Sequence, residues 1–314
     1  MHLSLLALVF VRVVTAVRTF TVYNGCPFTV WPAIYTNLAA GTAVPQYQTG
    51  WQADAYTTVN FSVPDAWTSG RIWGRRDCTF PAGNTSASTC LDGGCTGGLL
   101  CDVNTGTGMP PATLAEFSLG GTTGTDFYDV SLVDGYNLPI RITPTSGCAV
   151  AECPWDLGPL CPTTLAGPFD STGYPVGCKS ACIAGVDGNP SKSPNCCSGS
   201  FNTPQTCPSS GVAFYWFFKG YCPNAYAYPF DESSGTALWT CPSNNLADYT
   251  ITFCPAPDGA EPSVSPPSTS TSFAFESTTS WMSTPSSMNI MSTTTGTTQP
   301  APGSDTLPNS SVCI

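Results

Sequence analysis

The sequence predicts an all-β sandwich that is stabilised by disulfide bonds. Several short segments alternate apolar and polar residues and are rich in β-branched and aromatic side chains. They are separated by Gly, Pro, Asn and Asp, which are typical of the turns between strands. Sixteen of the 17 cysteines lie between Cys26 and Cys254, an even number that can pair completely.

The strands are expected in seven segments: 19–36, 57–63, 70–80, 113–119, 127–133, 138–145 and 248–254. No run with a helical period appears before residue 170, and the best short helix candidate covers residues 172–185. The segment 148–222 is rich in Pro, Gly and closely spaced Cys. Such a segment buries little apolar area and needs covalent crosslinks. The aromatic run at 212–228 is predicted to form core and to cover these loops.

The two ends of the chain differ in composition from the body. Residues 1–16 are mostly apolar and end in Val14-Thr15-Ala16, which predicts a cleaved secretory signal followed by a folded body at 17–257. Residues 258–314 are rich in Ser, Thr and Pro and are expected to form a disordered, O-glycosylated tail. The protein is therefore expected to be secreted, extracellular or associated with the cell wall.

Three asparagines and one cysteine remain to be assigned. Asn60, Asn84 and Asn309 each begin an Asn-x-Ser/Thr pattern and are predicted N-glycosylation sites. Cys313 is the odd cysteine and is either free or paired with another molecule.

The composition excludes several kinds of site. Metal binding competes with disulfide formation as an explanation of the cysteines, but no zinc-type Cys/His spacing is present, so we expect no metal. The only histidine, His2, lies in the signal, which excludes catalytic triads that use histidine. No phosphate-binding or dinucleotide-binding glycine motif occurs, and no cofactor is expected.

The charge balance indicates which classes of molecule the protein can bind. The formal net charge is −11 and no basic stripe is present, so nucleic acid is excluded as a partner. Neutral polymers or cationic partners fit this composition better. We expect a monomer without a transmembrane segment.

The stretch 113–135 carries four acids and no base. Alternation places Glu116 opposite the apolar face of its predicted strand, and it places Asp129 likewise in the next strand. If the strands are neighbours, both carboxylates emerge on one face, near the turn signal Asp134-Gly135. Asp126 is interpreted as a loop residue. The pattern alone favours a solvated strand face, and a functional carboxylate cluster is the alternative.

Six segments carry a resemblance to a known family: GRIWGRRDC (70–78), CLDGGCTGGLLC (90–101), PPATLAEFSL (110–119), DFYDVSLVDGYNLPI (126–140), FYWFFKGYCPNAYAYPFDE (214–232) and YTITFCP (249–255). With the order of the sixteen cysteines, they make the body resemble the thaumatin-like, pathogenesis-related proteins. One departure is that the family's usual Cys-x-Thr-Gly-Asp-Cys reads Cys90-Leu-Asp-Gly-Gly-Cys95, so that the acid has moved to Asp92.

The resemblance implies a β-sandwich core with a disulfide-rich loop domain at about 148–222 and a small hairpin lobe. It also implies eight disulfides: Cys26–Cys254, Cys78–Cys90, Cys95–Cys101, Cys148–Cys241, Cys153–Cys222, Cys161–Cys178, Cys182–Cys196 and Cys197–Cys207.

The resemblance further implies an acidic cleft lined by Glu116, Asp129, Asp134 and Asp231. An Arg that completes the family's usual set is expected near residues 48–54, where this sequence has Trp51 and no Arg. We therefore expect the cation to be missing and Trp51 to offer an aromatic surface for a sugar ring.

Two carboxylates are what glycoside hydrolysis requires, one as acid and one as base or nucleophile. The resemblance implies action on β-1,3-glucan of the cell wall, with Glu116 as acid and Asp134 as base or nucleophile. Asp129, Asp231 and Trp51 are then candidate substrate-binding residues. A non-catalytic glucan-binding or antifungal defence protein is the alternative, and a structural wall component is a third hypothesis.

Overall fold

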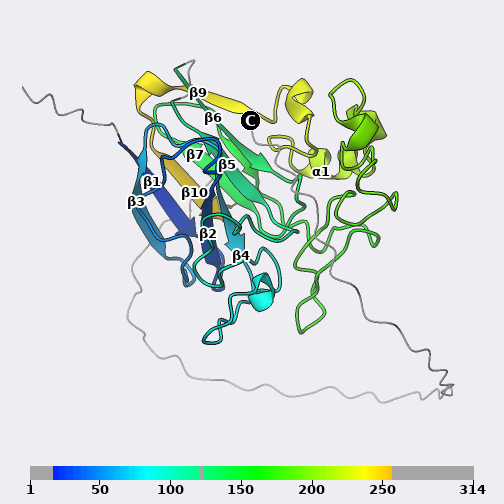
Figure 1. The fold of residues 1–314 in the computed structure, drawn as a ribbon, viewed down its shortest axis with the longest axis horizontal. Coiled ribbons are helices and arrows are strands. Elements are labelled where there is room, and N and C mark those ends of the chain that lie inside the picture. The colour runs from blue at the N-terminus through cyan, green and yellow to red at the C-terminus, as the bar shows by residue number, and fades with distance from the viewer. Residues whose placement is uncertain (1–16, 121–123, 257–314) are drawn as a thin grey trace, which may run out of the picture. The chain divides into compact units, whose positions relative to one another are not determined.

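The computed structural model describes residues 17–120 and 124–256, so the predicted signal, the tail, Asn309 and Cys313 lie outside the described residues. Two five-stranded sheets form the fold (Figure 1). In the first sheet the strand order is β3 (Thr58–Pro64), β1 (Val17–Asn24), β10 (Tyr249–Phe253), β7 (Ile140–Pro144) and β8 (Ala151–Cys153). In the second sheet it is β2 (Trp31–Thr36), β4 (Gly70–Arg75), β5 (Leu114–Ser118), β6 (Thr125–Ser131) and β9 (Trp239–Pro242).

Each of the seven predicted segments overlaps at least one strand, which confirms the all-β class. β1 and β10 run parallel, and the other neighbours in both sheets run antiparallel. The short strands β8 and β9 were not predicted. They lie in or near the cysteine-rich part of the chain, where three or four residues are too few to show an alternating pattern.

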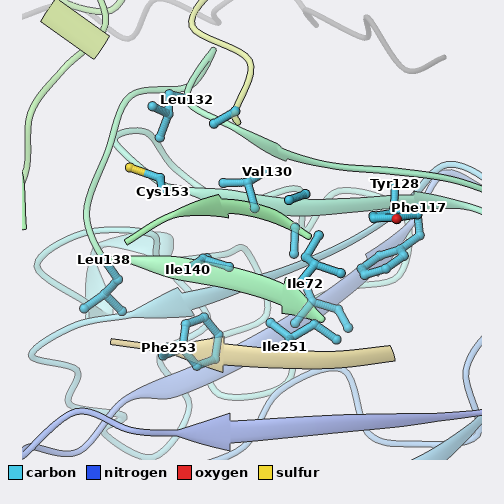
Figure 2. Packing of buried hydrophobic residues seen from close by; sticks show 14 of the residues in the cluster. Ile72, Phe117, Tyr128, Val130, Leu132, Leu138, Ile140, Cys153, Ile251 and Phe253 are labelled. Carbon is cyan, nitrogen blue, oxygen red and sulfur yellow. The ribbon is translucent and has the colours of Figure 1, made fainter. Parts of the chain in front are cut away.

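The core lies between the two sheets. The ring of Phe117 in β5 packs edge-to-face on Phe20 of β1 at 4.9 Å and on Tyr249 of β10 at 5.5 Å, measured between ring centroids. Figure 2 shows Ile72 and Val130 of the second sheet in the same cluster as the residues that the first sheet contributes. This packing buries one face of β4, β5 and β6. Their other face carries polar side chains and also a second buried apolar cluster, which includes Trp73 and Leu114.

All eight disulfides that the resemblance implies are present. Cys26–Cys254 joins the chain just beyond the ends of the parallel pair β1 and β10. Cys78–Cys90 and Cys95–Cys101 crosslink the hairpin lobe, which includes residues 78–101. Three short-range bridges, Cys161–Cys178, Cys182–Cys196 and Cys197–Cys207, crosslink the loop domain. Loops with few buried side chains are thus held by covalent bonds.

The helix candidate at 172–185 is wrong. That segment forms turns, because Pro175 and the glycines around it do not support a helical run. The only α-helix in the described residues is α1 (Tyr215–Tyr221), within the aromatic run, with Tyr215 and Phe218 buried. Short 3-10 turns are η1 (Ala87–Thr89), η2 (Gly199–Phe201), η3 (Ser209–Gly211), η4 (Asp231–Ser234) and η5 (Ser243–Asn245).

Candidate functional site

A row of charged side chains crosses three neighbouring strands of the second sheet. Arg71 of β4 lies directly opposite Glu116 of β5, and Glu116 lies directly opposite Asp129 of β6. Residues directly opposite each other in antiparallel strands point to the same face. The shared face that alternation predicts for Glu116 and Asp129 is therefore confirmed, and Arg71 extends the row.

A tight turn after β6 brings in a third acid, Asp134. The backbone N–H of Gly135 donates to the carbonyl of Leu132 at 2.9 Å, and Gly135 has a φ of +85°. A Cβ at this position would lie 2.8 Å from the carbonyl oxygen of Cys178, so glycine is required for both conformation and space. The carbonyl of Asp134 accepts a hydrogen bond from the N–H of Ala112 at 3.1 Å, which anchors the turn beside β5.

The guanidinium of Arg71 links two of these carboxylates. Its Nη2 lies 3.3 Å from Oε1 of Glu116 and its Nη1 lies 3.8 Å from Oδ2 of Asp134. The two contacted oxygens are consequently less than roughly 9.5 Å apart, the outer separation for the carboxyl pair of a glycosidase. The side chains of Glu116 and Asp134 are 22% and 27% exposed, so both reach solvent.

The expectation of a missing cation is wrong. The sequence has no Arg near residues 48–54, but Arg71 contacts the two candidate catalytic acids directly. The signal was present in the segment 70–78, where Arg71 precedes the buried pair Ile72 and Trp73. A charged residue at the start of a buried strand, opposite an acid in register, is a candidate ion pair.

Burial governs the electrostatics of the row. Desolvation raises the pKa of Glu116, and the nearby charge of Asp134 raises it further, while Arg71 and a hydrogen bond from Ser131 lower it. Desolvation also raises the pKa of Asp134, against the lowering effect of Arg71. The pKa of Asp129 is raised well above its usual value by desolvation and then by the charge of Glu116. Such carboxyl groups hold a proton to higher pH than free ones do.

A segment that pairs with the end of β6 brings further groups to the row. Tyr226 pairs with Ser131, and its N–H donates to the carbonyl of Val130 at 2.8 Å. Burial raises the pKa of the Tyr226 hydroxyl, and the charges of Asp129 and Glu232 raise it further. Glu232 also raises the pKa of Asp129, which makes it a further acid of the site that the sequence reasoning missed.

The comparisons with known proteins agree with this architecture. A model of the Thaumatin family matches residues 24–255. The chain belongs to the Thaumatin family. A pathogenesis-related thaumatin-like protein 3.5 of Cryptomeria japonica is 42% identical over 76% of this chain and 90% of its own length. Two further relatives are each 38% identical. Glucan endo-1,3-beta-glucosidase of Prunus avium covers 76% of this chain and 90% of its own length, and pathogenesis-related protein 5 of Arabidopsis thaliana covers 81% and 97%.

Within this thaumatin-family fold, the substrate-binding role predicted for Asp231 is wrong. Its side chain is buried, and both carboxylate oxygens are already engaged. Oδ1 accepts from the hydroxyl of Tyr215 at 2.9 Å, and Oδ2 accepts from the N–H of Ala227 at 3.0 Å and pairs with Lys219 at 2.9 Å. Asp231 therefore fixes the segment that contains Tyr226 and Ala227 from inside, and its neighbour Glu232 is the residue whose charge acts on the acidic row.

The sugar-stacking role predicted for Trp51 is also wrong. Its residue is only 4% exposed, and its ring packs edge-to-face on Tyr47 at 5.0 Å and on Phe61 at 6.2 Å. The ring belongs to the core cluster and offers no face to a sugar. The position of Trp51 in the sequence, near the place where an Arg was expected, does not indicate on which side of the sheet its ring lies.

Asp126 is not a loop residue. It lies in β6 and is fully buried, where its carboxylate pairs with Arg18 at 3.0 Å. It accepts hydrogen bonds from the N–H of Gly120 at 2.8 Å and from the hydroxyls of Ser243 and Tyr249. This network ties β1, β6 and β10 together and is structural.

The remaining site predictions concern sugar attachment and metals. Asn60 in β3 and Asn84 in the hairpin lobe are both exposed, and their glycosylation stays a prediction. Across residues 17–120 and 124–256, no three His, Cys, Asp or Glu side chains group as ligands for a metal. Nor do these residues form a helix with the length and apolar character needed to cross a membrane.

Proposed function

We propose that this protein binds β-1,3-glucan along the acidic row and hydrolyses it with Glu116 and Asp134. The observation that supports this most is the placement of two partly exposed carboxylates against one guanidinium. Cleavage of a glycosidic bond needs two carboxyl groups that reach the substrate and lie within the separation used by glycosidases, and this pair meets both conditions.

The proposed roles follow from the surroundings of each acid. Glu116, whose pKa is raised by burial and by Asp134, holds its proton and donates it to the leaving glycosidic oxygen as the C–O bond breaks. Asp134 either takes a proton from the water that attacks the anomeric carbon, or attacks this carbon itself to form a glycosyl ester, which water activated by Glu116 afterwards hydrolyses. Asp129, opposite Glu116, binds the sugar or stores a proton beside the acid. Arg71 orients both carboxylates and limits the rise of their pKa values.

A relative supports the choice of substrate. The Prunus avium protein that is 38% identical over 76% of this chain carries the name glucan endo-1,3-beta-glucosidase. We infer from this likeness that the linkage is β-1,3 and that the cleft takes a glucan chain.

A second candidate function is non-catalytic glucan binding by a defence protein. Two observations favour it: the relatives from Cryptomeria japonica and Arabidopsis thaliana are named pathogenesis-related, and Asp129 is only 7% exposed. With Asp129 buried, Glu116 and Asp134 are the carboxylates of the row that reach solvent, and two exposed carboxylates can bind sugar hydroxyls without transferring a proton.

We further propose that the protein is secreted and acts as a monomer at the cell wall. Eight disulfides require an oxidising compartment to form and persist. The Ser/Thr-rich tail would then hold the folded body at the wall.

Binding and hydrolysis measured in one sample separate the two candidates. The purified protein is incubated with an insoluble β-1,3-glucan, and bound protein and released reducing sugar are both quantified. Retention with steady release supports the enzyme. Retention without release leaves glucan binding alone, and absence of both contradicts action on this glucan.

A further inference from the structure

Helix α1 exposes a large aromatic side chain that the fold does not use. Trp216 is 74% exposed, while its helix neighbours Tyr215, Phe218 and Lys219 are buried. The indole is nevertheless positioned, because it packs edge-to-face on the ring of Tyr215 at 4.9 Å between centroids. An exposed Trp held in place by a buried ring is an anchor suited to a binding surface.

Trp216 borders a hollow of about 430 Å³ between α1 (Figure 1) and the turn at η4. Tyr215, Lys219, Ser234 and Thr236 also line this hollow. It combines an aromatic wall with a few polar groups, which is the usual composition of a small-ligand site. None of the residues of the acidic row lines it.

Two of the hydroxyl groups in the hollow, those of Ser234 and Thr236, donate their protons within the protein and face the hollow as acceptors. The hydroxyl of Ser234 donates to the carbonyl of Asp231 at 2.7 Å, and that of Thr236 donates to the carbonyl of Pro223 at 2.7 Å. A hydroxyl has one proton and two lone pairs. Oγ of Ser234 also accepts from the N–H of Thr236 at 3.3 Å, which uses one of its lone pairs. Since both protons are used within the protein, the lone pairs that remain on Ser234 and Thr236 favour a ligand that donates hydrogen bonds.

Lys219 is the only charged residue that lines the hollow, and a carboxylate neutralises its charge. The ammonium group of Lys219 pairs with Asp231 at 2.9 Å and donates to the carbonyl of Ala225 at 2.9 Å. One of its three N–H groups is left to donate to a ligand oxygen. Because the partner carboxylate already neutralises this ammonium, and because the whole chain is acidic, the hollow favours a neutral ligand over an anion.

We propose that this hollow is a second carbohydrate-binding site, which takes a unit of a neutral glycan independently of the acidic row. The apolar C–H face of a pyranose ring packs on the indole of Trp216. Ring hydroxyls donate to the oxygens of Ser234 and Thr236, and a ring or hydroxyl oxygen accepts from Lys219. A polyhydroxylated, uncharged ring with one apolar face matches each of these groups.

Nuclear magnetic resonance of the full chain labelled with 15N tests this site directly. The indole N–H resonance of Trp216 is assigned with the variant Trp216→Phe and followed during titration with oligosaccharides. Neutral β-1,3-gluco-, cello- and chito-oligosaccharides are used, with oligogalacturonate as the anionic comparison. At least one neutral series should produce a saturable shift at Trp216. Trp155, which is 48% exposed elsewhere, is the matched control and should not shift.

Three variants define the contacts and the independence of the site. The affinity of Trp216→Ala is read from the backbone amide resonances of residues that line the hollow, since the indole signal is absent. It should fall roughly tenfold, as expected for truncation of an aromatic anchor, and Thr236→Val should weaken the affinity severalfold. The double variant Glu116→Gln with Asp134→Asn should leave the shift at Trp216 unchanged.

Three results would overturn the proposal: no shift with any neutral series, equal shifts at Trp216 and Trp155, or a shift with oligogalacturonate alone. If glucan hydrolysis fails but the shift at Trp216 persists, the proposed activity of the acidic row is wrong and the second site stands.

Discussion

Asp92 is a buried acid that should make stability depend on pH in a specific window. It is 3% exposed, its Oδ1 accepts from the side-chain amide of Asn137 at 2.9 Å, and its Oδ2 is buried without a hydrogen-bond partner in the described part of the chain. Burial raises its pKa from 3.8 to about 7, against the lowering effects of Asn137 and Arg76. The folded protein therefore holds this proton to a higher pH than the unfolded chain does.

The sign of the effect follows from linkage. Between pH 4 and 7 the folded state binds more protons at Asp92 than the unfolded state does, so this residue's contribution to stability falls as pH rises. A shift of roughly three pH units corresponds to about 4 kcal/mol. The variant Asp92→Asn carries no such charge. Its unfolding free energy should therefore match wild type near pH 4 and exceed it by up to about 4 kcal/mol above pH 7.

Denaturant unfolding at a series of pH values, with the disulfides intact, measures this difference. Asp102→Asn is a suitable control, because hydrogen bonds from Asn104 and Thr105 lower the pKa of Asp102 and place its titration below the window. A difference between Asp92→Asn and wild type that is constant from pH 4 to 8 would refute the reasoning.

Three further predictions concern the acidic row and its supports. Replacing Arg71 with Gln removes the cation that lowers the pKa values of Glu116 and Asp134, so both limbs of the pH profile for glucan hydrolysis should move to higher pH; an unmoved profile would contradict this. Gly135→Ala should lower the free energy of unfolding by about 2 kcal/mol or more, since it adds a Cβ at a φ of +85° and 2.8 Å from a carbonyl oxygen. The same variant should also hydrolyse glucan more slowly. If denaturant unfolding gives Gly135→Ala the same free energy of unfolding as wild type, the strained turn at Gly135 is contradicted. Trp51→Ala should lose about 3–5 kcal/mol of stability, because the ring is a core side chain, yet keep glucan affinity in the fraction that remains folded. Weakened binding at unchanged stability would restore its stacking role.

The strands of the sandwich could be predicted because their pattern is local. In β5, buried Ala115 and Phe117 flank half-buried Glu116, and this period of two is visible without any knowledge of partners. The same pattern placed Asp129 on the face of Glu116. The disulfide pairing, in contrast, came only from the resemblance, because spacing does not determine connectivity.

The site predictions that were wrong concern residues whose contacts join segments far apart in the sequence. Arg71 reaches Glu116 through the pairing of β4 with β5, across 45 residues of chain. Asp231 and Glu232 are adjacent and alike in sequence, and only the packing of Tyr215 and Lys219 decides which of them is buried. Periodicity cannot separate such alternatives, because it reports which residues share a face and not what later covers that face.

The most direct test of the central claim is the rate of reducing-sugar release from a β-1,3-glucan by wild type, Glu116→Gln and Asp134→Asn, each with glucan binding measured in parallel. Glu152→Gln is the matched control, since Glu152 is 23% exposed and pairs with Arg141 away from the row. Wild type and Glu152→Gln should both release reducing sugar. Each variant of the row should lose about 100-fold or more while still binding. Release at the wild-type rate by both row variants would contradict the central claim.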